Sequence, residues 1–142
     1  MKTLNQTKIN FLSLSENESF ARTVVSAFVT QLDPTVEEMV EIRTAVSEAV
    51  TNCIVHAYKN RTGNIEMSLK ILEGNEIYIR IKDAGCGIAD IKKAVEPLFT
   101  TSPNEERAGL GFSVMESFMD KMQVRSKTDS GTVVIMRKKV GA

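Results

Sequence analysis

Three stretches of the sequence hold residue types whose spacing could support catalysis. They are Glu48 to Asn52, Asp83 to Gly87, and Gly109 to Gly111. A carboxylate can accept a proton, an amide oxygen can bind Mg²⁺, and the start of a helix offers backbone N–H groups to phosphate. Each stretch alone is also typical of an ordinary feature: a solvated helix face, a turn after a strand, or a hinge before a helix. Together they predict a nucleotide pocket.

Glu48, Asn52 and His56 recur every four residues, so an α-helix would place them on one face. This set differs from the lysine and glutamate mixture of an ordinary exposed face, and asparagine is a weak helix former. We therefore predict that Glu48 accepts a proton from an attacking hydroxyl and that Asn52 binds Mg²⁺. We interpret His56 as a helix residue rather than as a ligand or phosphate acceptor.

Asp83 is predicted to end a strand, where its carboxylate can accept a hydrogen bond from an exocyclic amine such as that of adenine. Gly85 and Gly87 would let the backbone approach a flat ring, because glycine has no Cβ. Thr132 follows Gly131 at the start of a strand, where it either lines the same pocket or serves only as a β-former.

The run Gly109-Leu110-Gly111 precedes a predicted helix, so its free N–H groups and the helix dipole would favour phosphate. It is not a Walker motif, since no Gly-Lys-Ser or Gly-Lys-Thr occurs. Arg107, just before this turn, is either a phosphate contact or an exposed side chain.

Two helices are predicted early in the chain, each from a capping box. Ser15 with Glu18 starts the first helix, which runs to about residue 32, and Thr35 with Glu38 starts a longer one that ends near Tyr58. The apolar stripe of the first comprises Phe20, Val24, Ala27, Phe28 and Leu32. That of the second comprises Met39, Ile42, Val46, Ala49, Val50, Cys53 and Ala57.

Alternating apolar residues predict strands at 7–14, 65–71, 77–81, from 122, and at 132–136. A helix after Gly111 lies between the third and fourth, and Arg137 to Lys139 are interpreted as a solvated end. We expect one domain over residues 1–142. The order predicts an α+β fold: a two-layer sandwich with a mixed, mostly antiparallel sheet and helices on one face.

Composition excludes several classes of protein. The formal net charge is +0, which argues against a nucleic-acid binder, although a local basic patch stays open. One histidine and two separated cysteines are too few for a zinc site. No run reaches the roughly 18 apolar residues of a membrane span, and the start lacks a signal-peptide core. We therefore expect a cytoplasmic protein that binds neither nucleic acid nor membrane directly.

Taken together, Glu48-x-x-x-Asn52, Asp83-x-Gly85-x-Gly87, a long loop, Gly109-x-Gly111 and Gly131-Thr132 resemble the GHKL (Bergerat) ATP-binding superfamily. Finer matches are similar to the anti-sigma serine kinases of spore-forming bacteria, in the group that acts on a sigma-F-like factor. They lie at Ser15–Arg22, Val46–Asn52 and Pro97–Thr101.

The resemblance implies an activity and its partners. The protein would inhibit a sporulation sigma factor and, as an ATP-dependent serine/threonine protein kinase, phosphorylate and inactivate an anti-anti-sigma partner. It would work as a homodimer with ATP or ADP and Mg²⁺.

The resemblance also implies roles for single residues. Glu48 would be the general base, Asn52 the Mg²⁺ ligand and Asp83 the reader of adenine. Residues 89–108 would form a lid over the nucleotide, and Glu18 and Arg22 would face a partner. The other residues implied for nucleotide binding are Gly85, Gly87, Thr100, Thr101, Arg107, Gly109, Leu110, Gly111 and Thr132.

Two alternatives remain open. In one, nucleotide only gates a sigma-binding module that has little kinase activity. In the other, the chain is a histidine-kinase-type ATP-binding domain, although its single histidine, His56, lies within the predicted nucleotide helix.

Overall fold

The computed structural model describes residues 2–88 and 111–141. Its elements are β1 (Thr3–Leu12), α1 (Glu16–Val29), the 3-10 turn η1 (Thr30–Leu32), α2 (Val36–Asn52), the π-helical turn η2 (Cys53–Ala57), β2 (Asn64–Leu72), β3 (Glu76–Asp83), α5 (Phe112–Phe118), β4 (Lys121–Lys127) and β5 (Gly131–Lys139). This order confirms the predicted one. None of the helices in these ranges is long and apolar enough to cross a bilayer.

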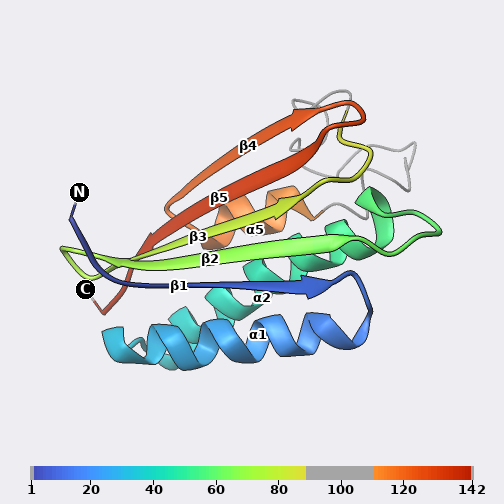
Figure 1. Cartoon of the computed structure of the whole chain (residues 1–142). Helices are drawn as coiled ribbons and strands as arrows, with labels where there is room; N and C mark the ends of the chain where they lie inside the picture. The colour runs from blue at the N-terminus through green and yellow to red at the C-terminus, as the bar shows by residue number, and fades with distance from the viewer. Residues whose placement is uncertain (1, 89–110, 142) are drawn as a thin grey trace, which may run out of the picture.

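The five strands form one sheet in the order β1-β2-β3-β5-β4. We expected a mixed, mostly antiparallel sheet, and each of the four strand pairs is antiparallel. Helices α1, α2 and α5 all lie on one side of it (Figure 1). The predicted two-layer α+β architecture is therefore confirmed.

The core lies between the sheet and the helices and follows the period of each element. On β2 and β3 every second side chain is buried, including Met67, Leu69 and Ile79, at 0% exposure. From α2, Ile42 and Val46 meet them from the other layer, also at 0%. The apolar stripe predicted for the second helix is thus the face through which α2 packs against the sheet.

The capping box predicted for α2 is present. The backbone N–H of Glu38 donates to Thr35 Oγ1 at 3.1 Å, and the backbone N–H of Thr35 donates to Glu38 Oε1 at 2.9 Å. The second bond favours the ionised carboxylate, and it is the main reason why the pKa of Glu38 is lowered. The start of α2 is therefore fixed as the sequence predicted.

The capping box predicted at the start of α1 is absent, so that prediction was wrong. Ser15 has helical dihedrals (φ −58°, ψ −32°) and makes no cap bond; its hydroxyl donates instead to Glu16 Oε1 at 2.9 Å. The predicted stripe is confirmed only in part: Leu32 is buried and Val24 and Phe28 pack against the core. However, α1 also buries Ala21, Val25 and Val29, which the predicted stripe did not include. Phe20, a member of the predicted stripe, is 48% exposed.

Arg137 to Lys139 are not a solvated end, because β5 continues through Lys139. Lys138 is on the core side with its side chain 12% exposed, and its Nζ lies 3.5 Å from Glu41 Oε1. It also donates to the carbonyl of Phe118 at 2.8 Å. This lysine therefore joins the end of the sheet to α2 and α5.

Candidate active site

Helices α2 and α5 bring Glu48 and Gly111 together. Gly111 has φ 64°, and a Cβ at this position would overlap Glu48 Oε2. The left-handed backbone favours glycine at this position, and a side chain here would displace the Glu48 carboxylate. Glu48 of the first predicted stretch and Gly111, the one residue of the third stretch that the structure describes, therefore lie side by side.

Asn52 is the last residue of α2 and is 8% exposed. The next turn is π-helical, from Cys53 to Ala57, and its wider hydrogen-bond spacing ends the α-helical period. The four-residue spacing that grouped His56 with Glu48 and Asn52 does not hold beyond Asn52. His56 is half-buried, and its carbonyl accepts a hydrogen bond from Cys86 Sγ at 3.3 Å.

Asp83 ends β3 with its carboxylate enclosed by the protein, and the residue is 5% exposed. Its Oδ1 accepts from the backbone N–H of Gly85 at 2.9 Å and of Thr132 at 3.2 Å. Its Oδ2 accepts from Cys53 Sγ at 3.4 Å. Burial nevertheless raises the pKa of Asp83, since desolvation outweighs these bonds.

Cys53 was predicted as a small core residue, and its 3% exposure confirms the burial. Its thiol hydrogen bond to Asp83 was missed. Burial, followed by the charge of Asp83, raises the pKa of this thiol well above its usual range, so it stays a neutral donor. One signal in the sequence did indicate that Cys53 lies near the candidate site: it directly follows Asn52, a predicted site residue.

The glycines after Asp83 are explained by the protein's own packing. A Cβ on Gly85 would overlap the carbonyl oxygen of Ala57, and one on Gly87 would overlap that of Lys127. The N–H of Cys86 also donates to the Ala57 carbonyl at 3.1 Å. The turn is therefore held between η2 and the β4–β5 hairpin. The sequence had ascribed these glycines to the approach of a flat ring.

Two hydroxyl groups that the sequence did not single out complete this region. Ser126 Oγ accepts from the N–H of Ile88 at 2.7 Å and lies 2.8 Å from Thr132 Oγ1. Tyr58 Oη accepts from the N–H of Ala84 at 2.6 Å. Thr132 is 8% exposed, and its N–H and its hydroxyl both form hydrogen bonds inside the fold. Hydroxyl residues are too common in a sequence for such roles to be recognised.

The remaining predicted site residues fall in two groups. Glu18 and Arg22 lie on α1, where Arg22 Nε is 3.3 Å from Glu18 Oε2. Outside the described residues lie the predicted lid, 89–108, and Thr100, Thr101, Arg107, Gly109 and Leu110.

Residues 11–138 match the histidine kinase-like ATPase domain family. The anti-sigma F factor of Thermoanaerobacter sp. (strain X514) is 56% identical over 142 residues, which are 100% of this chain and 99% of the relative. The anti-sigma F factor of Clostridium kluyveri is 51% identical, covering 94% of both chains. This chain belongs to the anti-sigma F factor family. The family resemblance seen in the sequence is therefore confirmed.

Solved structures agree with this fold. An RsbU and RsbW domain structure from Mycobacterium tuberculosis superposes with a TM-score of 0.69 at 12% identity, covering 96% of this chain and 32% of that one. The catalytic domain of histidine kinase ThkA gives 0.58 at 16% identity, covering 96% and 97%. At these identities the likeness concerns architecture alone. The anti-sigma F assignment comes from the sequence relatives.

Proposed function

We propose that this chain is a single ATP-binding kinase domain that acts as an anti-sigma factor in the cytoplasm. It would inhibit a sporulation sigma factor and phosphorylate a serine of an anti-anti-sigma protein, which is thereby inactivated. The observation that carries the proposal is Glu48 held against Gly111, in a chain whose relatives are anti-sigma F factors over nearly their whole length.

The nucleotide base would be recognised by Asp83. A carboxylate has about four lone-pair positions, and the bonds from Gly85, Thr132 and Cys53 use three of them. One position stays available for an exocyclic amine, so the carboxylate fits adenine. Guanine presents a carbonyl oxygen there, which a carboxylate would repel.

Asn52 would hold Mg²⁺ through its amide oxygen, a hard ligand at the buried end of α2. When bound, the ion would neutralise charge on the phosphates. Gly109, Leu110 and Gly111 would contact the phosphates, with Arg107, Thr100 and Thr101 supplied by the lid. These last assignments rest on the family resemblance.

Glu48 would act as the general base. The serine oxygen of the partner would bond to the γ-phosphorus, the bond from that phosphorus to the ADP oxygen would break, and the hydroxyl proton would pass to Glu48. Its closeness to Gly111 supports this role, because Gly111 is the last residue of the turn that we propose contacts the phosphates.

The partner surface would lie on the first half of α1. The Glu18–Arg22 pair flanks Phe20, whose side chain is 48% exposed, and Leu14 nearby is 41% exposed. Exposed apolar groups beside an ion pair are typical of a protein interface. We propose that this surface contacts the sigma or anti-anti-sigma partner in the homodimer.

Glu48→Gln tests the catalytic proposal. It keeps the side-chain shape but cannot take a proton. Phosphate transfer to the anti-anti-sigma protein should fall by roughly 10² to 10⁴, while ATP affinity stays close to that of the parent. Glu37→Gln, an exposed position in the first turn of the same helix, is the control. If Glu48→Gln transfers phosphate at the parent rate, another residue is the base.

A further inference from the structure

Basic side chains gather on the face of the sheet that α1, α2 and α5 leave uncovered (Figure 1). The side chains on this outer face alternate with the buried ones along each strand. The outer face carries two carboxylates, Glu66 and Glu76, against nine cations: Lys8, Lys70, Arg80, Lys82, Lys121, Arg125, Lys127, Arg137 and Lys139. A chain whose formal net charge is +0 thus concentrates positive charge on one side.

Both carboxylates of the outer face are already paired. Glu66 Oε1 lies 3.1 Å from Arg80 Nη1, and Glu76 Oε1 lies 2.6 Å from Arg137 Nη2. Within the part of the chain that the structure describes, the other seven cations have no carboxylate at ion-pair distance. Their repulsion is unfavourable for the isolated chain, and a bound anion would relieve it.

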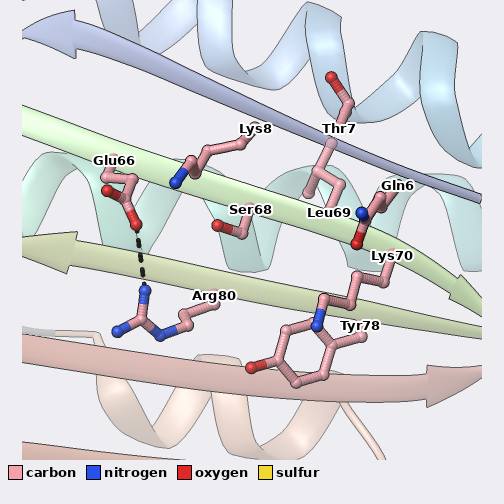
Figure 2. Close-up of a pocket in the computed structure, with 9 residues that line it drawn as sticks. All are labelled: Gln6, Thr7, Lys8, Glu66, Ser68, Leu69, Lys70, Tyr78 and Arg80. Carbon is pink, nitrogen blue, oxygen red and sulfur yellow. Dashed lines mark hydrogen bonds and ion pairs between the residues drawn. The ribbon is translucent and has the colours of Figure 1, made fainter. Parts of the chain in front are cut away.

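A groove of about 600 Å³ crosses this face over β1, β2 and β3. Figure 2 shows Lys8, Lys70 and Arg80 among the residues that line it, with the Arg80 guanidinium paired to Glu66. Ser68 and Tyr78 add hydroxyl groups to the same lining. Three cations thus line the groove against the single carboxylate of Glu66, and this excess of positive charge suits carboxylates of a partner.

The neighbouring positions distinguish a protein from a nucleic acid. Val133 and Ile135 are half-buried apolar residues on the outer face of β5, paired with Lys82 and Arg80 of β3. The Tyr78 ring, by contrast, is covered by Lys70, whose Nζ lies 5.2 Å from the ring centre. Val133 and Ile135, bordered by cations, suit a protein segment in which acidic and apolar residues alternate. The Tyr78 ring face that Lys70 covers cannot stack on a nucleic-acid base.

We propose that the outer face of the sheet docks an acidic segment of a partner protein. Its carboxylates would occupy the groove between Lys8, Lys70 and Arg80, and its apolar side chains would contact Val133 and Ile135. Asp83 and Thr132 face the opposite layer, so this docking leaves the nucleotide site free. Because charges on an exposed face are screened, docking weakens as salt rises.

The test is fluorescence polarisation with a labelled peptide of alternating glutamate and valine. The double variant Lys8→Glu/Lys70→Glu should bind it at least about tenfold more weakly than the parent, since each reversal replaces attraction by repulsion. Lys59→Glu/Arg61→Glu carries the same change in net charge on an exposed turn off this face, and should bind like the parent. A glutamine–valine peptide should not bind.

Several results would overturn the docking proposal. They are equal binding by both double variants, affinity unchanged up to about 0.15 M salt, and tighter binding of a labelled single-stranded DNA than of the peptide. Self-association of the parent that Lys8→Glu/Lys70→Glu abolishes would assign the face to a second copy of this chain instead. ATP binding by the variant, measured in parallel, separates this outcome from failure of the nucleotide site.

Discussion

Asp83→Asn separates the proposed role of this carboxylate in nucleotide binding from its role in the fold. The amide oxygen of the variant can still accept from the N–H groups of Gly85 and Thr132, which bond Oδ1 in the parent. The amide nitrogen replaces Oδ2 and faces Cys53, whose sulfur can act as a weak acceptor. The variant should therefore fold.

The effect on ATP is larger, because the variant presents a donor where an amine would need an acceptor. Losing a hydrogen bond to a charged group costs about 1.5–3 kcal/mol, which corresponds to roughly 10- to 150-fold in affinity. Isothermal titration calorimetry with ATP measures it. Asp129→Asn is the matched control, since Asp129 is an exposed turn residue of the adjacent hairpin with φ 63°, which asparagine tolerates.

Asp83→Asn should weaken ATP binding but should not lower the stability of the fold. Burial raises the pKa of Asp83, so the folded chain binds this proton more readily than the unfolded chain. The ionised carboxylate therefore destabilises the fold above its raised pKa, and this penalty disappears below about pH 3.9, the ordinary value for Asp. Without nucleotide, Asp83→Asn should be at least as stable as the parent at neutral pH, and that advantage should fade on acidification. Parent-like ATP affinity in Asp83→Asn would refute the adenine assignment.

Three further substitutions test individual contacts. Thr35→Ala should lower the free energy of unfolding by about 1 kcal/mol, whereas Ser15→Ala, which removes no cap bond, should cost less in the same urea titration. Cys53→Val leaves a buried oxygen of Asp83 without its thiol donor and should lower the free energy of unfolding by about 1–3 kcal/mol. Cys53→Ser supplies a hydroxyl donor and should lose much less stability. Equal losses in the two variants would contradict the thiol hydrogen bond. Gly111→Ala should lose phosphate transfer, because a Cβ there displaces Glu48 and a left-handed residue costs about 1–2 kcal/mol; parent-like transfer would show that the contact is not needed.

The parts of the fold that depend on one element at a time were predictable. The alternation in β2 and β3 identified their buried faces, and the pattern at Thr35 and Glu38 identified the start of α2. The same pattern at Ser15 failed because its backbone is already helical, so its hydroxyl does not cap the N–H groups of the first turn. A capping box therefore depends on the direction from which the chain enters the helix.

The contacts of the candidate site were not predictable from the sequence. The roles assigned to Glu48, Asn52 and Asp83 from residue type and spacing stay predictions. The bond from Cys53 to Asp83 needs η2 and β3 to meet, and no local pattern encodes that. Lys138 was misread for a similar reason: its partner Glu41 is on a helix far away in sequence.

The central claim is tested most directly by incubating the chain with γ-labelled ATP, Mg²⁺ and an anti-anti-sigma protein, and then locating the label. The account predicts label on a serine of that protein and its loss in Glu48→Gln. Label on His56 of this chain, or no transfer although ATP binds, would contradict it. The first result would indicate a histidine-kinase-type reaction, and the second a nucleotide-gated binding module.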